Sequence, residues 1–175
     1  LSLQNHPLMK RLFCTLLFAI FVQFLFANQP YHFSHLSVKD GLSQLNVTCI
    51  YQDKLGYIWF GTRNGLNKFN GNSFEVYWNH ADNPHSISSN IINCMAEDAE
   101  GNLWVGTENG LNRLDKNKNE FKRYHINQQE NKDKNKITSL CLDQQGTLWI
   151  GAASEGLFAY TPQGDSLKNI STKEL

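Results

Sequence analysis

Recurring carboxylates and a pair of histidines are the residues whose types could support chemistry in this 175-residue chain. Asp53, Asp98 and Asp143 stand 45 residues apart, and His32 and His35 have a ligand-like separation of three. Each aspartate opens an Asp-x-x-Gly sequence, in which Asp hydrogen-bonds its own backbone and Gly accepts a positive φ. Residues three apart on a strand point to opposite faces. The pattern therefore predicts turn-forming aspartates and two separate histidines.

Other catalytic, metal and nucleic-acid signals are missing from the sequence. It contains no Gly-x-Ser-x-Gly, no His-Glu-x-x-His, no phosphate-binding glycine loop and no cysteine pair at zinc spacing. Its 16 basic and 16 acidic residues balance, which disfavours a nucleic-acid partner. Cys49 and Cys94 occupy equivalent positions and Cys141 is shifted by two, so these thiols are expected to pack in the core. We predict no catalytic residue, no metal site and no cofactor.

The aspartates belong to a longer repeated unit that must position anything the chain binds. Trp59, Trp104 and Trp149 share the 45-residue step, and a Gly-Leu pair follows each of them. Self-similarity at one period over three units indicates one supersecondary unit stacked on copies of itself. The residues of the repeated frame are Asp53, Gly56, Trp59, Gly61, Asp98, Gly101, Trp104, Gly106, Asp143, Gly146, Trp149 and Gly151.

Each unit is predicted to be a four-stranded antiparallel β-sheet. The copies begin with the apolar-alternating runs Val47–Gln52, Ile92–Glu97 and Ile137–Leu142, and the turn after each run folds the Trp strand back on it. No helical apolar stripe runs through the repeat. Four short strands in about 45 residues make one propeller blade. The expected fold is all-β, with about three blades and an incomplete ring, because six to eight blades need roughly 270–360 residues.

The segments outside the blades have their own signals. Residues 1–8 are expected to be translated upstream sequence, and 9–27 a secretory signal peptide, because Lys10 and Arg11 precede an apolar run; an uncleaved anchor is the alternative. Within the leader, 28–45, the segment Tyr31–Leu36 alternates like a fourth strand. It is expected to complete the last blade of a closed ring and to be unpaired here. The blades are expected at 46–90, 91–135 and 136–175, with the third truncated before a fourth.

The turn between the second and third strands keeps its flanking glycines in every copy, while the charge of the residues between them changes. This variation points to a binding face. The turn between the second and third strands carries Arg63 in the first copy and Glu108 in the second, and Glu155 in a longer third turn. These turns are expected to share a face with the connecting loops 79–90 and 127–136, where propellers usually bind ligands. The candidate ligand-binding residues are Arg63, Glu108, Glu155, His80 and His85.

The repeat, with the leader His35–Ser43 before it, resembles the two-component regulator propeller repeat from about Tyr31 to Leu167. The third copy departs from it at Ala152, which replaces the usual Thr, and by one extra residue before Gly156. The resemblance implies the N-terminal part of the periplasmic sensor region of a two-component histidine kinase, which can be a hybrid. Such a receptor is anchored to the inner membrane and dimeric when intact. Its ligand would be a small molecule or an oligosaccharide.

The resemblance also implies that enzyme activity lies outside this chain, in a histidine kinase or diguanylate cyclase module beyond the remaining blades. Two other classes stay open. A propeller lyase or hydrolase would need histidine and glutamate side chains converging at the top of the ring. A secreted adhesion or scaffold propeller would carry no signalling module.

Overall fold

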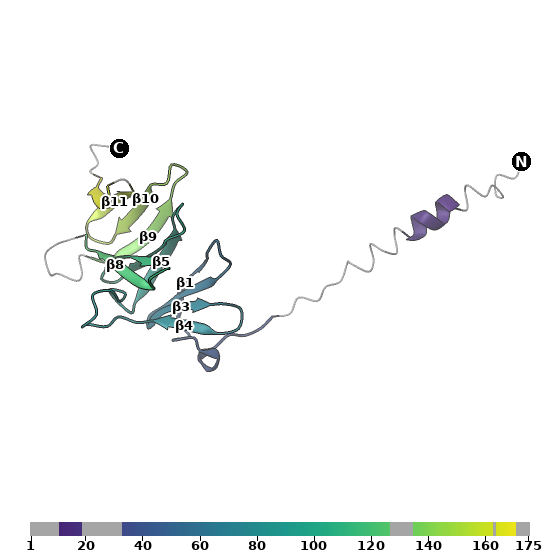
Figure 1. Cartoon of the computed structure of the whole chain (residues 1–175), viewed down its shortest axis with the longest axis horizontal. Helices are drawn as coiled ribbons and strands as arrows, with labels where there is room; N and C mark the ends of the chain where they lie inside the picture. Colours follow the sequence, from purple (N-terminus) through teal and green to yellow (C-terminus); the bar gives the residue numbers. More distant parts are fainter. Residues whose placement is uncertain (1–10, 19–32, 127–134, 163, 171–175) are drawn as a thin grey trace, which may run out of the picture. The chain divides into compact units, whose positions relative to one another are not determined.

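The computed structural model describes residues 11–18, 33–126, 135–162 and 164–170, and the chain divides into two units, Leu1–His35 and Leu36–Leu175. In the first unit, residues 11–18 form a helix with exposed side chains (Figure 1). No helix among the described residues is long and apolar enough to cross a membrane. Most of the expected signal peptide, together with Tyr31 and His32 of the expected closing strand, lies outside the described residues. Residues 33–36 belong to no strand.

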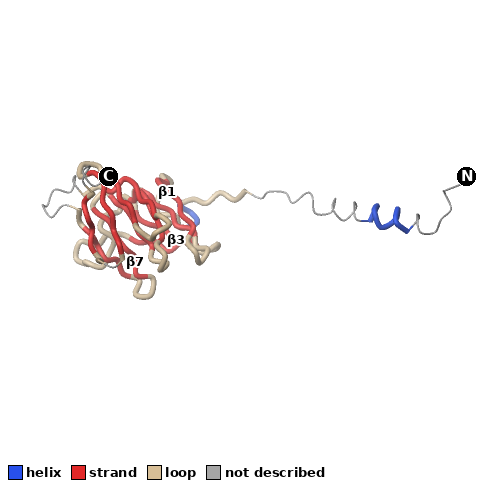
Figure 2. Tube along the Cα trace, turned by 90° about the horizontal axis from the view of Figure 1, so that it is seen from above, coloured by secondary structure: helices blue, strands red, loops and turns tan. Residues whose placement is uncertain are grey.

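In the described part of the second unit, the regular secondary structure is almost entirely β-strand, and the strands are joined by loops and turns (Figure 2). A short 3₁₀ helix, η2 (Val38–Asp40), precedes them. The strands of the first sheet are β1 (Val47–Gln52), β2 (Ile58–Thr62), β3 (Gly65–Phe69) and β4 (Phe74–Tyr77). Those of the second sheet are β5 (Ile92–Glu97), β6 (Leu103–Thr107), β7 (Gly110–Asp115) and β8 (Glu120–Tyr124). Those of the third sheet are β9 (Ile137–Leu142), β10 (Leu148–Ala152), β11 (Gly156–Thr161) and β12 (Ser166–Asn169).

Every sheet is an antiparallel meander in which each strand pairs with the next along the chain. The three sheets follow one another from blue through green to yellow in Figure 1. In the described part of the chain they form no closed ring. The predicted fold class is therefore confirmed: the chain is all-β, with three four-stranded propeller blades in an incomplete ring.

The first strands of the blades lie side by side, with β5 next to both β1 and β9. The Thr48 hydroxyl donates a hydrogen bond to the Ile92 carbonyl at 2.6 Å. One blade further on, the Asn93 amide donates to the Ile137 carbonyl at 2.9 Å. Because equivalent positions make equivalent bonds, the blades succeed one another by the same step, as the first strands do around a propeller axis.

The glycine two residues after each of the first two tryptophans permits this close approach. A Cβ on Gly61 would lie 2.5 Å from Cys49 Sγ and 2.8 Å from Ile92 Cγ2. A Cβ on Gly106 would meet the equivalent Cys94 and Ile137 atoms at 2.5 and 2.6 Å. Real side chains do not approach this closely, so a larger residue would push the next blade away.

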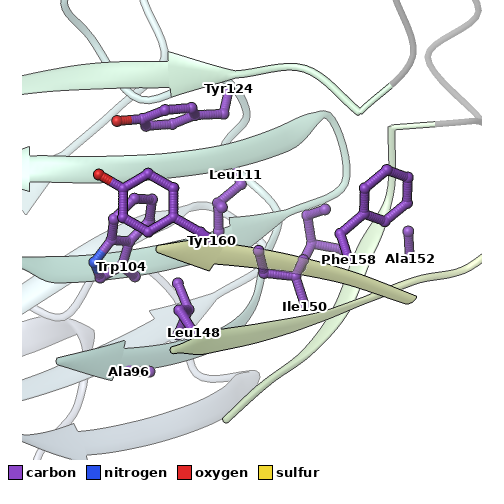
Figure 3. Packing of buried hydrophobic residues seen from close by; sticks show 10 residues of the cluster. Ala96, Trp104, Leu111, Tyr124, Leu148, Ile150, Ala152, Phe158 and Tyr160 are labelled. Atoms are coloured by element: carbon purple, nitrogen blue, oxygen red, sulfur yellow. The ribbon is translucent and has the colours of Figure 1, made fainter. Parts of the chain in front are cut away.

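Hydrophobic cores fill the spaces between neighbouring blades. Between the second and third blades, the Trp104 ring packs 4.5 Å from Tyr160 and 5.3 Å from Tyr124, measured between ring centroids (Figure 3). Between the first and second, Tyr77 packs against Trp59 of its own blade at 5.8 Å and against Phe121 of the second blade at 5.6 Å. Trp59 and Trp104 are buried, whereas Trp149 is only partly buried because no further blade covers it among the described residues.

The prediction that all three repeat thiols pack in the core is wrong for Cys141. Cys49 and Cys94 are partly buried beneath the next blade, but Cys141 is exposed. Its sequence shift places it opposite Trp149, while Ser139 lies opposite Gly151, the position that Cys49 and Cys94 occupy opposite Gly61 and Gly106. The third blade also lacks a following blade in the described residues, so this thiol faces solvent.

Candidate ligand-binding face

The turns between second and third strands contact the segments that lead into the blades. The backbone N–H of Gly65 donates to Asn90 O at 2.7 Å, and that of Glu108 donates to Ile91 O at 3.1 Å. The same contact recurs from Ala153 N to Lys136 O at 3.0 Å. We call this surface, formed by the β2–β3, β6–β7 and β10–β11 turns with residues 78–91 and 135–136, the loop face.

A groove of about 590 Å³ opens on the loop face between the β6–β7 turn, the β10–β11 turn and the segments that precede β5 and β9. Its lining includes a carboxylate and an ammonium group, from Glu108 and Lys136, and amide or hydroxyl groups from Asn79, Asn109 and Ser154. A groove with several convergent polar groups on loops is a common form of ligand site.

Glu108 is the most constrained of these polar side chains. Its Oε1 atom accepts a hydrogen bond from Lys136 Nζ at 2.9 Å, and its Oε2 atom accepts one from Asn93 Nδ2 at 3.2 Å. Partial burial alone would raise the pKa of the carboxyl, but these two hydrogen bonds outweigh it and hold the pKa below its usual value. Glu108 is therefore a fixed carboxylate at neutral pH, and it joins the second blade to the third.

The other predicted site residues divide between the loop face and its surroundings. Arg63 is exposed in the β2–β3 turn, and its charge also lowers the pKa of Glu108. Glu155 lies in the β10–β11 turn, where its carbonyl accepts from Asn169. His80 and His85 are exposed in the loop before the second blade, and neither lines the groove with Glu108. Of the connecting loop at 127–136, residues 127–134 lie outside the described residues.

Trp78 was missed as a loop-face residue by sequence reasoning. It lies just beyond β4, is 43% exposed, and donates from Nε1 to the Asn64 carbonyl at 3.1 Å. Gly65 allows this packing, since a Cβ there would lie 3.1 Å from the indole Cδ1. The signal was present in the sequence, because Trp78 is the one tryptophan of four outside the 45-residue period.

A buried polar cluster holds the segment that enters the second blade. Ser88 N donates to Asn112 Oδ1 at 2.9 Å, and the Ser88 and Thr107 hydroxyls lie 2.9 Å apart. The first blade repeats this cluster with Ser43, Thr62 and Asn67. In the third blade the Thr and Asn positions are taken by Ala152 and Phe158, both buried. The change at Ala152 therefore goes together with the change at Phe158, and the two replace a polar contact by an apolar one.

A second polar network joins the first two blades at the turns opposite the loop face. The Lys116 ammonium lies 3.1 Å from Asp53 Oδ2 and 3.0 Å from Glu97 Oε1, and both carboxylates are almost fully buried. The Lys54 N–H also donates to Glu97 at 2.8 Å. Burial would raise the pKa of Asp53, but hydrogen bonds from Trp59 and Lys116 lower it. These satisfied partners indicate a structural joint, and no cluster that could hold a metal ion occurs among the described residues.

Three segments of the sequence, residues 41–64, 86–109 and 132–154, match the family described as two component regulator propeller. The chain therefore carries three repeats of the two-component regulator propeller type. Its three matched segments each contain the Asp-x-x-Gly turn, the Trp strand and the start of the variable turn on the loop face.

This propeller chain is similar to parts of much longer proteins. It is 48% identical over 61 residues to Histidine kinase P4 of Formosa agariphila, which covers 35% of this chain and 4% of that protein. The extracellular domain of a putative hybrid two component system from B. thetaiotaomicron superimposes with a TM-score of 0.71 at 27% identity, covering 82% of this chain and 21% of that one.

A virginiamycin B lyase from Staphylococcus aureus has a similar fold, with a TM-score of 0.53 at 18% identity over 73% of this chain and 42% of that one. At this identity the likeness concerns the fold alone. The propeller chain spans less than half the length of each of these proteins.

Proposed function

We propose that this chain is part of the ligand-sensing propeller of a two-component signal transduction receptor. The match of three segments to the regulator propeller family is the observation that carries the proposal. The similarity to the extracellular domain of a putative hybrid two component system supports an exported, periplasmic location. The chain itself has no enzymatic role in this proposal, and an output module anchored to the inner membrane completes the receptor.

The ligand site we favour is the groove on the loop face. Glu108 and Lys136 supply fixed charges, and Asn79, Asn109 and Ser154 supply amide and hydroxyl groups for hydrogen bonding. Trp78 does not line the groove itself, but it directly precedes the lining residue Asn79 and adds a half-exposed aromatic ring held in place by its own hydrogen bond. A ring face beside several hydrogen-bonding groups suits a ligand with both apolar faces and many hydroxyls, which supports an oligosaccharide.

Signalling in this proposal depends on a difference in ligand affinity between two arrangements of the blades or protomers. The groove is suited to this because the Glu108–Lys136 contact joins two blades across it. A ligand that engages both side chains would favour one arrangement of these blades. The remaining blades and a dimer of receptors would transmit the change to the output module.

Isothermal titration of oligosaccharides into the receptor exterior that contains this chain tests the proposal. Trp78→Ala and Glu108→Gln should each weaken binding at least tenfold. Glu100→Gln, which makes the same chemical change in the exposed turn between β5 and β6, should leave the affinity unchanged. Equal affinities for Glu108→Gln and Glu100→Gln would mean that the ligand binds outside this groove. If the unmodified exterior bound no oligosaccharide, the hypothesis of an oligosaccharide ligand would be rejected.

The lyase alternative is less well supported by the side chains. It needs histidines and glutamates that converge, and within the described residues His80 and His85 do not line the groove with Glu108. A secreted adhesion propeller would share the fold, but the match to the regulator family favours a sensor.

A further inference from the structure

A second groove, of about 560 Å³, follows the outer strand β8 of the second blade. Its walls come from β7, the β7–β8 turn, β8 and the loop residues Pro84 and His85. The loop is held against the strand by a hydrogen bond from Phe121 N to His85 O at 2.8 Å. This groove is separate from the one on the loop face, since no residue lines both.

Positively charged groups dominate the lining, and most of them have a carboxylate partner. Lys118 lies 3.9 Å from Asp115. Arg113 and Lys122 share the Asp165 carboxylate, which is 3.8 Å from Arg113 Nη1. The fourth cation of the groove is Arg123, and among the described residues no carboxylate pairs with it.

Among the described residues, the Arg123 guanidinium donates only to uncharged oxygens. Its Nε donates to Ser86 O at 2.7 Å, and its Nη2 donates to Asn83 O at 2.9 Å and to Ser86 Oγ at 2.7 Å. Partial burial lowers the pKa of the guanidinium, which nevertheless remains charged at neutral pH. Within the described part of the chain its Nη1 makes no hydrogen bond, so one donor group of an oriented cation is unused.

His125 lies two residues after Arg123 and also lines the groove. The His85 ring is 3.9 Å from Glu120, so it has an acidic neighbour, whereas His125 has none among the ion pairs of the described residues. Arg123 also donates from Nη2 to Ile87 O at 3.4 Å, and an arginine held by four hydrogen bonds loses little further freedom when it binds a ligand. Guanidinium groups bind carboxylate and sulfate oxygens through strong, charge-assisted hydrogen bonds.

We propose that the β8 groove binds an anionic group, a carboxylate or a sulfate, with Arg123 as the main donor and His125 beside it. The anion supplies the counter-charge that the described residues do not provide for Arg123. The site is independent of the loop-face groove, so a ligand bound there would not compete with this anion.

Isothermal titration of the full 175-residue chain with sodium sulfate and, separately, sodium acetate tests the site against a sodium chloride background of constant ionic strength. We expect saturable binding with a dissociation constant on the order of 1 mM for at least one anion. Arg123→Gln should weaken it at least tenfold. Lys39→Gln removes an exposed positive charge that lines neither groove and should leave the binding unchanged.

Because Arg123 also holds the loop carbonyls, His125→Gln provides a second variant that spares those bonds. It should weaken anion binding about threefold while the near-ultraviolet circular dichroism stays the same. Saturation by either anion supports the site, and the more tightly bound anion identifies the preferred group. No binding above the chloride background, or equal binding by Arg123→Gln and the unmodified chain, would overturn the proposal.

Discussion

At the scale of single residues, the repeated aspartate links the turn to the core. In all three blades one carboxylate oxygen accepts backbone N–H groups of the turn and the other accepts the indole N–H of the tryptophan six residues later. The indole bonds are Trp59 to Asp53 at 3.0 Å, Trp104 to Asp98 at 2.8 Å and Trp149 to Asp143 at 2.8 Å. The turn role is readable from Asp-x-x-Gly, whereas the bond to the indole requires the paired strands to be folded.

The contribution of this hydrogen bond to the free energy of unfolding should depend on how deeply the indole is buried. Asp98→Ala leaves the Trp104 N–H without a partner in a fully buried core, so we expect a loss of about 2–3 kcal/mol in the free energy of unfolding. Asp143→Ala removes the same bond from Trp149, which water reaches, and should cost clearly less. Urea denaturation followed by tryptophan fluorescence measures both variants, and equal losses would contradict this account.

At the scale of elements, the strands were predictable and the joints between blades were not. The predicted first strands Val47–Gln52, Ile92–Glu97 and Ile137–Leu142 match β1, β5 and β9, because alternation and a tight turn are local signals. Lys116 and Asp165, which hold neighbouring blades together, fall outside the repeated motif. Their partners are 41 to 63 residues away or on another strand, so only the docked blades bring them together.

The same distinction applies to the candidate site. The change of charge between equivalent turns pointed to Glu108, which lines the loop-face groove. The sequence could not show that Lys136 is its hydrogen-bond partner. Trp78 was visible as a tryptophan outside the period, yet its exposure depends on how it rests against Gly65. His80 and His85 were chosen because they lie in the connecting loop 79–90, but neither lines the groove with Glu108.

The ion pairs of Lys116 with Asp53 and Glu97 lead to a prediction about how stability depends on pH. Asp53 has a lowered pKa in the folded chain, so its contribution is present above the unfolded value of about 3.9 and is lost as the pH falls through the folded pKa. Lys116→Met would leave two buried carboxylates without a counter-charge and raise the pKa of Asp53. We expect a loss of about 3 kcal/mol at pH 7 and, in contrast to the unmodified chain, greater stability as the pH is lowered towards 5.

Thermal denaturation of Lys116→Met at pH 5 and pH 7 measures this reversal. Lys118→Met is the matched control, because Lys118 is exposed and its ion pair among the described residues is with the half-exposed Asp115. Its melting temperature should follow that of the unmodified chain at both pH values. A Lys116→Met variant that loses stability on acidification would show that the two carboxylates do not depend on this lysine.

At the scale of the whole molecule, the end blades leave apolar surface uncovered. Leu45, Ile50 and Leu55, in and beside β1 of the first blade, are each more than 60% exposed. On the third blade Trp149 is partly buried and Cys141 is exposed. In a repeat protein each unit is stabilised by its interfaces with its neighbours. A blade with one neighbour therefore has only one of its two interfaces.

Residues 28–175 expressed alone should therefore dimerise or aggregate through these open blades. Light scattering after size-exclusion chromatography at micromolar concentration should give a mass of at least twice that of one chain. Ile50→Lys places a charge on the exposed face of β1 and should shift the distribution towards the monomer, whereas Lys39→Gln should not. A sharp monomeric peak with a cooperative thermal transition would mean that three blades are stable alone and would contradict this account.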